Sequence, residues 1–349
     1  MSKYIALLAN DLHCTLDTIP DFQANWREML QEAKNCGVEK IVLGGDLFTT
    51  RAAQNLYVLL AVKDMIQTVS KSFPLYILNG NHDKIDQSSI LSYNHLFDVI
   101  SNVHIIDTFS VITFKSSDIA IIGISYFPES GKFNEYLDEA IEETADIPTE
   151  DKILYIHEGI HGALGDFDIP GELPNNIFGD FDKVLVGHYH NRTDIKDTNI
   201  SCIGSSRQAN FGEDEEKGYT LIDKDGGVGF VKNEVNDRYM TFDVTFKQIN
   251  DNFLLEITHF RNEGYKVRVK IKCSDTEATQ IDRKSLIDAG ASKIEVKSDR
   301  LEKINGLAAA SSAVSEKHDK NSIMKEYVTF CDQKRIESQL GLKYLEKLN

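Results

Sequence analysis

The sequence has few cysteines, and none of them belongs to a pair with metal-binding spacing. The five are scattered through 349 residues, at Cys14, Cys36, Cys202, Cys273 and Cys331, and no Cys-x-x-Cys pair occurs. This pattern excludes a zinc ribbon and a disulfide-stapled mini-protein. Free thiols in a reducing compartment fit it best, so we expect a cytoplasmic protein.

Long apolar runs are also missing from the sequence. No stretch of about 18 apolar residues occurs, so we expect no membrane-spanning helix and no membrane partner. The N-terminus is apolar for a few residues and then becomes acidic, which is not the pattern of a signal peptide. With 41% apolar residues, the chain still has enough material for a full globular core.

Positive charge is scarce in the first two thirds of the chain. Residues 1–237 hold 38 of the 55 acidic side chains but only 18 of the 38 basic ones. An acidic segment repels nucleic acid, because that binding depends on neutralising phosphates. If the protein acts on DNA, bound metal cations, the later residues or a partner must supply positive charge. The acidity is explained equally well as a property that keeps the protein soluble.

What the sequence does contain is an alternation of strand and helix signals. Strands are predicted at three short apolar runs, residues 4–9, 40–44 and 75–78. Helices are predicted where apolar residues recur at helical spacing, at 21–36, 52–70 and 131–144. The early order implies parallel strands joined by right-handed crossovers. The many short strands after residue 100 then favour a two-sheet α/β sandwich.

Composition divides the chain into four parts. We expect a large α/β domain at 1–237, a small α/β unit at 238–303, a linker at 304–320 and two amphipathic helices at 321–349. The last segment is too short to bury its own apolar face, so it must dock on this chain or on a partner. The residues expected on that face include Ile323, Tyr327, Leu342 and Leu345.

Polar clusters follow the predicted strands at the points where the strands end. Four of these clusters lie at 10–13, 44–46, 79–83 and 187–190, and His157 ends a fifth apolar run. Functional groups of α/β sheets gather beyond the carboxyl ends of strands. A single histidine there would most often be structural, but five strand ends with Asp, Asn or His favour a shared site. Carboxylate, amide and imidazole ligands suit Mn²⁺ or Fe²⁺ better than Ca²⁺ or thiolate-bound zinc.

Read in order, these clusters carry the motifs D-x-H, G-D, G-N-H-D, H and G-H-x-H. Their order resembles that of the calcineurin-like metallophosphoesterases, and the resemblance implies a site for two divalent ions, with Mn²⁺ as the expected metal. The implied ligands of one ion are Asp11, His13, Asp46 and His190, and those of the other are Asp46, Asn81, His157 and His188. By the same resemblance, His82 would be the general acid or would orient the scissile phosphate, and Asp83 would orient His82.

A narrower resemblance points to the nuclease branch of that family. The segments GGDLFTTR at 44–51, IGS at 203–205 and EKGY at 216–219 are similar to those of meiotic-recombination-eleven and SbcD-type DNA nucleases. The short length and helical end resemble the bacteriophage recombination endonuclease subunits. Two departures are Thr49, where many relatives have His or Asp, and Cys14-Thr15, where cellular relatives have Leu-Gly.

This branch implies a Mn²⁺-dependent nuclease with 3′→5′ exonuclease action on duplex DNA and endonuclease action on single strands. It would be the catalytic subunit of an SbcCD-like complex for DNA repair, recombination and replication, in a bacterial cell or a phage-infected host. Residues 238–303 would cap the DNA. Residues 321–349 would bind an SMC-like coiled-coil ATPase, with the chain as a homodimer within a heterotetramer.

The candidate DNA contacts are Arg51, Arg207 and a basic strand with Lys266, Arg268, Lys270 and Lys272 on one face. Ion pairing of the two arginines and a solvated sheet face are the alternatives.

Three other functions compete for these residues. Residues 157–161 match the zinc-protease pattern H-E-x-x-H, but that motif requires a helix, and here it follows a strand and contains Gly159. A metallophosphodiesterase or phosphatase for small or protein phosphoesters would explain the acidic charge, but it leaves the later segments without a role. A scaffold that only binds DNA ends would not need the full ligand set.

Overall fold

The computed structural model describes residues 3–86, 89–128, 130–145, 151–165 and 169–298. The expected linker and the helical segment with Ile323, Tyr327, Leu342 and Leu345 lie outside these residues. The chain divides into two units: Met1–Met240 with Phe260–Lys266, and Thr241–His259 with the residues from Val267 onward. Among the described helices, none has the length and apolar character needed to cross a membrane.

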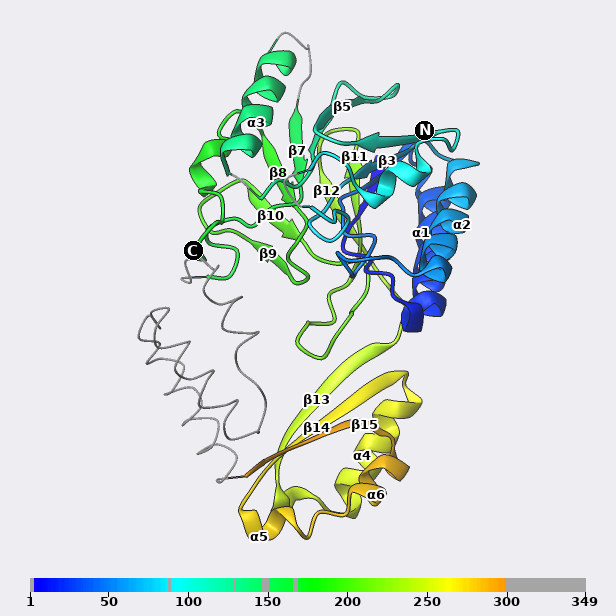
Figure 1. The fold of residues 1–349 in the computed structure, drawn as a ribbon, viewed down its shortest axis with the longest axis vertical. Coiled ribbons are helices and arrows are strands. Elements are labelled where there is room, and N and C mark those ends of the chain that lie inside the picture. The colour runs from blue at the N-terminus through cyan, green and yellow to red at the C-terminus, as the bar shows by residue number, and fades with distance from the viewer. Residues whose placement is uncertain (1–2, 87–88, 129, 146–150, 166–168, 299–349) are drawn as a thin grey trace, which may run out of the picture. The chain divides into compact units, whose positions relative to one another are not determined.

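Two six-stranded sheets form the first unit (Figure 1). The strands of one sheet are, in order, β12 (Val228–Lys232), β11 (Gly218–Asp223), β1 (Tyr4–Ala9), β2 (Lys40–Leu43), β3 (Leu75–Leu78) and β4 (Val103–Ile106). The other has β5 (Phe109–Thr113), β6 (Ala120–Ile124), β7 (Lys152–Ile156), β8 (Lys183–Val186), β10 (Ile200–Ile203) and β9 (Arg192–Asp194). The predicted two-sheet α/β sandwich is confirmed.

Three helices cover the outer faces of the sheets. They are α1 (Ile19–Cys36) and α2 (Leu56–Ser70) on the first sheet and α3 (Ser130–Thr144) on the second. The helix α1 ends at Gly37, which adopts the left-handed conformation with a φ of 63°. The helix α2 begins four residues later than predicted, because the Asn55 side chain accepts a hydrogen bond from the Tyr57 N–H and caps it. Short 3₁₀ helices lie at Leu16–Thr18, Tyr93–Phe97, Asn175–Phe178 and Phe246–Gln248.

The central core lies between the two sheets. Ile5 and Val42 of the first sheet belong to the same apolar cluster as Ile153, Tyr155 and Leu185 of the second. Each sheet also has one further apolar cluster, which lies between the sheet and the helices that cover it. Since both faces of the central strands are buried, these strands are apolar without alternation, as the sequence predicted.

The direction of the central strands decides where the polar clusters meet. Strands β1, β2 and β3 are parallel in the first sheet, and β6, β7 and β8 are parallel in the second. The carboxyl ends of parallel strands all lie at the same edge of their sheet. The loops that follow β1, β2, β3, β7 and β8 carry the five polar clusters.

A three-stranded sheet with helices forms most of the described part of the second unit, and its first strand begins in the last residues of the first unit. Its strands are β13 (Arg238–Thr245), β14 (Tyr265–Cys273) and β15 (Ala291–Ser298), with β14 in the centre. Its helices are α4 (Asp251–Asn262), α5 (Asp275–Ala278) and α6 (Arg283–Ala289). Along β14, Val267, Val269 and Ile271 are buried, and the basic residues alternate with them. The expected functional boundaries at 237/238 and 303/304 remain predictions.

Candidate metal centre

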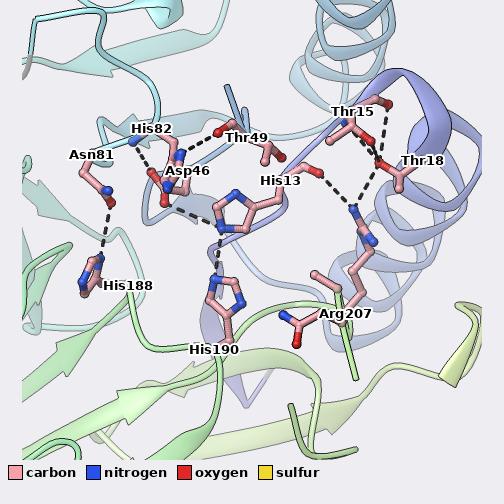
Figure 2. Close-up of a pocket in the computed structure, with 12 residues that line it drawn as sticks. His13, Thr15, Thr18, Asp46, Thr49, Asn81, His82, His188, His190 and Arg207 are labelled. Carbon is pink, nitrogen blue, oxygen red and sulfur yellow. Dashed lines mark hydrogen bonds and ion pairs between the residues drawn. The ribbon is translucent and has the colours of Figure 1, made fainter. Parts of the chain in front are cut away.

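The seven predicted ligands come together beside one cavity, although they lie far apart in the sequence. Figure 2 shows five of them, His13, Asp46, Asn81, His188 and His190. Each follows the end of a strand, and together they follow β1, β2, β3, β7 and β8. The residues are Asp11, His13, Asp46, Asn81, His157, His188 and His190. Most of them are buried. Burying several polar side chains costs free energy, so a strong interaction must offset that cost.

One group of candidate ligands consists of Asp11, His13 and His190. The Nε2 atoms of the two histidines are 3.0 Å apart. Each of these nitrogens lies 3.7 Å from Oδ1 of Asp11. Three ligand atoms therefore converge on one point from two strand ends.

A second group consists of Asp11, Asp46 and His157. Nε2 of His157 is 3.4 Å from Oδ2 of Asp46 and 3.2 Å from Oδ1 of Asn81. Nδ1 of His188 lies 3.3 Å from the same Asn81 oxygen. Oδ2 of Asp46 is also 3.7 Å from Nε2 of His13, so Asp46 lies between the two groups. Asp11 belongs to both groups as well, which the motif order did not indicate.

The backbone of several candidate ligands has an uncommon conformation. The φ angles of Asp11, His13, Asp46 and His188 are 53°, 45°, 56° and 75°. A non-glycine residue in this left-handed region costs on the order of 1–3 kcal/mol, and such residues concentrate at functional sites. Contacts between the loops oppose this strain, because the N–H groups of Asp11 and His13 donate to the carbonyls of Gly45 and Asp46.

Asp83 makes contacts that the resemblance does not imply. Its buried carboxylate accepts hydrogen bonds from backbone N–H groups of Asp46, Leu47 and Gly80, at 2.8, 2.9 and 2.9 Å. Among the described residues, it makes no hydrogen bond to the His82 imidazole. Asp83 therefore holds the backbone of two ligand loops together, and the expectation that it orients His82 remains a prediction.

His82 is oriented by a backbone group instead. Its Nδ1 lies 2.5 Å from the carbonyl oxygen of Thr49, and its backbone N–H donates to Oδ1 of Asp46. The imidazole lines the cavity beside the candidate ligands, with its ring 5.3 Å from that of His13 (Figure 2). Thr49 thus contributes to the site through its backbone carbonyl.

The donor set fits a divalent cation. Oδ1 of Asp11 is buried and has no hydrogen-bond partner within the described part of the chain. It lies within 4.0 Å of ring nitrogens of His13, His157 and His190. A buried carboxylate oxygen without a donor is costly, and a cation shared with these imidazoles would remove that cost. Carboxylate, amide and imidazole groups are ligands that divalent transition metals accept.

The pKa values of the histidines follow from burial and nearby carboxylates. Burial lowers the pKa of His188 to about 4 and also lowers that of His13, so both imidazoles are neutral near pH 7. Burial alone would lower the pKa of His157, but Asp46 and Asp11 raise it to about 10. A metal would have to displace the proton of His157, since only a neutral imidazole can bind it.

The cavity has a volume of about 360 Å³. Its other side is formed by residues outside the ligand set, namely Thr15, Thr18, Thr49, Arg207, Ala209 and Asn210. Arg207 is 3% exposed, and its Nη2 donates to the carbonyls of Leu12 and His13 at 3.1 and 3.0 Å. It therefore supports the ligand loop from behind, and a contact of Arg207 with DNA remains a prediction.

The remaining predicted residues lie in varied surroundings. Arg51 is exposed. Nζ of Lys266 is 3.0 Å from Oδ2 of Asp237, and Nη1 of Arg268 is 3.6 Å from Oε1 of Glu295. Ion pairs are therefore present at these two positions of the basic strand, where the alternative considered from sequence was a solvated sheet face. Residues 157–161 are not helical, so the zinc-protease alternative is excluded.

Sequence reasoning missed Glu213. Its Oε1 lies 2.7 Å from Nδ1 of His190, on the opposite side of the ring from the candidate metal. The only available signal was an acidic run at 213–216, and nothing in that run distinguishes the first acid from the next three.

Comparisons with known proteins identify the family of the chain. Residues 6–192 match the family described as calcineurin-like phosphoesterase. A putative phosphoesterase, 244L of Invertebrate iridescent virus 6, is 28% identical over 58% of this chain and 73% of its own length. A subunit of the nuclease SbcCD from Staphylococcus saprophyticus is 26% identical, over 52% of this chain and 54% of its own. The DNA double-strand break repair protein Mre11 of Sulfurisphaera tokodaii is also 26% identical, over 65% and 59%. This chain thus spans little more than half the length of the two nuclease relatives.

Proposed function

We propose, from the premise that the chain belongs to the calcineurin-like phosphoesterase family, that it is a Mn²⁺-dependent DNA nuclease. The observation that carries this proposal is the position of Asp46 between two ligand groups, with His82 beside them on the cavity. An arrangement of this kind suits a phosphodiester, which needs charge compensation at both the attacking and the leaving oxygen. The relatives named as nucleases favour DNA as the substrate.

The chain's own residues would bind the metals and move one proton. Two divalent ions would supply positive charge to the phosphate and activate a water molecule. Asp11, His13 and His190 would hold one ion, Asn81, His157 and His188 the other, and Asp46 would contact both. In its charged form, His82 donates Nδ1–H to the Thr49 carbonyl and keeps Nε2–H for the leaving oxygen. The Thr49 carbonyl fixes the ring in this orientation.

A nuclease assay with a matched variant tests the proposal. Purified protein with Mn²⁺ should degrade labelled duplex DNA from 3′ ends and cut single strands. The His82→Ala variant should lose about 10²–10⁴-fold in rate while it keeps Mn²⁺ binding, because general acid catalysis contributes that much. His104→Ala is the control, because His104 is exposed and stacks on Tyr76 away from the cavity. Hydrolysis of a small diester without DNA cleavage, even with the ATPase present, would refute the nuclease and favour a small-molecule phosphodiesterase.

The basic face of β14 would supply the phosphate contacts that the acidic first unit lacks. Arg268, Lys270 and Lys272 alternate with buried residues and lie on the face away from the apolar core of the second unit. We expect Lys270→Glu and Lys272→Glu to weaken DNA binding. Each substitution should also reduce the slope of log binding constant against log salt concentration by about one, because one phosphate contact is lost. Lys284→Glu on α6 is the control, because Lys284 is exposed on a helix and not on this strand. An unchanged salt dependence would favour a merely solvated face.

Residues 321–349 would bind a coiled-coil ATPase of the SMC type, and the complex would contain two copies of each chain. This part of the proposal rests on the amphipathic sequence and on the relative named as a subunit of SbcCD. Co-purification with such an ATPase, before and after deletion of residues 321–349, tests it. Binding that survives the deletion would assign the contact to another part of the chain.

A further inference from the structure

The segment 205–213 contacts residues of one ligand group at several points. The N–H of Ser205 donates to the His190 carbonyl at 3.0 Å, and the N–H of Ser206 donates to the Asn10 carbonyl at 3.2 Å. Arg207, in the same segment, holds the carbonyls of Leu12 and His13. These contacts place the segment directly behind the loops that carry Asp11, His13 and His190.

Glu213 ends this segment with a contact to a candidate ligand itself. Its side chain is 6% exposed, and Oε1 lies 2.7 Å from Nδ1 of His190. Oε2 accepts a hydrogen bond from the Ala209 N–H at 2.8 Å, and Asn210 donates to Oε1. The carboxylate is therefore fixed before any metal binds. With Nδ1–H donated to Glu213, the ring of His190 turns the lone pair of Nε2 toward Asp11 and His13.

The position of Glu213 is itself fixed from the other side. Gln208 donates from Nε2 to the Glu213 carbonyl at 2.8 Å and accepts at Oε1 from the Tyr239 N–H at 2.8 Å. The segment is thus tied to Tyr239, which belongs to the same unit. A support of this kind keeps the carboxylate in place at little entropic cost when the ion binds.

The histidines of the site do not all have such a partner on the ring nitrogen away from the metal. Nδ1 of His13 lies 3.1 Å from the Phe48 carbonyl, and Nδ1 of His157 lies 2.6 Å from the Gly44 carbonyl. A carboxylate stabilises positive charge on a metal-bound imidazole more than a neutral carbonyl does. The contact of Glu213 is made to a ligand of one ion only.

We propose that Glu213 is a positioning residue that sets the affinity of the ion held by Asp11, His13 and His190, and leaves the other ion nearly unaffected. This inference rests on the proposed metal centre. The loss of a carboxylate behind a metal-bound histidine lowers metal affinity by about 10–100-fold in general. We expect a loss of that size at one of two sites, so that a partly loaded, inactive protein forms at limiting Mn²⁺.

A Mn²⁺ titration followed by calorimetry and electron paramagnetic resonance tests this proposal. The wild type should bind two ions, and Glu213→Gln should weaken one of them by about 10–100-fold. Glu216→Gln is the matched control, because it lies three residues away, is 62% exposed in its side chain and pairs only loosely with Lys232, at 3.7 Å. Glu216→Gln should bind both ions like the wild type.

A double-mutant cycle separates positioning from a general loss of structure or charge. In a His190→Ala background, Glu213→Gln should have no further effect on Mn²⁺ binding, because its action passes through that imidazole. Equal weakening of both ions, or the same weakening without His190, would overturn the proposal. Circular dichroism in EDTA checks that each variant is folded, and Glu213→Asp provides a milder change if Glu213→Gln is not. A wild type that binds no divalent ion would instead refute the metal centre itself.

Discussion

Binding of Mn²⁺ should release protons, and His157 should supply most of them. Its pKa is raised to about 10 by Asp46, Asp11 and the Gly44 carbonyl, which together outweigh the effect of burial. The imidazole is therefore charged at pH 7.5 without metal, and it must lose its proton to bind one. Removing that proton at pH 7.5 costs about 3–4 kcal/mol, since each pH unit below the pKa adds about 1.4 kcal/mol.

The other histidines should contribute less. Burial lowers the pKa values of His188 and His13, so these two have no proton to release near pH 7. Burial would also lower the pKa of His190, but the hydrogen bond to Glu213 and the charge of Asp11 raise it. We therefore expect about one to two protons released per protein at pH 7.5. For each proton released, the apparent affinity for Mn²⁺ should rise about tenfold per pH unit, until the pH approaches the pKa of His157.

Isothermal titration calorimetry in buffers with different ionisation enthalpies measures this release. At pH 7.5, the observed enthalpy in PIPES, HEPES and Tris should vary linearly with the buffer enthalpy, and the slope gives the number of protons. The variant His104→Ala, altered at an exposed ring, should give the same slope as the wild type. A slope of zero, with an affinity that does not depend on pH between 6.5 and 8.5, would refute the electrostatic account of the site.

Two further predictions concern the packing around the site. A Cβ atom at Gly80 would overlap the side chain and backbone N of Asp46, so Gly80→Ala should abolish Mn²⁺ binding and lower the free energy of unfolding by about 1–3 kcal/mol. Gly131→Ala in α3 meets nothing within 4 Å and should be neutral or stabilising by urea denaturation. An equal response of the two variants would contradict this. Burial raises the pKa of the Cys14 and Cys202 thiols to about 12, so a thiol reagent at pH 8 should modify them only after unfolding. Rapid modification of either thiol in the native protein would show that it is accessible.

Local sequence patterns were sufficient to predict the fold and a shared site at the strand ends, whereas the ligand set was implied by the resemblance of the motif order to a known family. Apolar runs predicted β1, β2 and β3 within one residue. A strand that is buried on both faces is a continuous apolar run, so the local sequence is enough to identify it. Parallel strands then place the residues after each run at one edge. The start of α2 was missed by four residues, since it depends on a side-chain cap at Asn55 and not on apolar spacing.

The contacts behind the ligands could not be predicted in this way. The resemblance implies that Asp83 orients His82, but no sequence pattern predicts the hydrogen bonds that Asp83 accepts from a loop more than 30 residues away. Glu213 lies 23 residues after His190 in an acidic run that suggests only a solvated surface. Such contacts depend on the tertiary fold, which brings loops from different strands to one place. The periodicity of residues within one segment cannot predict them.

The binding of two ions by one constellation of side chains is most directly tested by diffraction at the manganese absorption edge from crystals soaked in Mn²⁺. The account predicts two anomalous peaks about 3.5–4 Å apart, with Asp46 in contact with both. It also predicts that His190 binds one ion through Nε2 and His157 binds the other. A single peak away from Asp46, or no peak at a Mn²⁺ concentration that supports phosphodiester hydrolysis, would contradict the account.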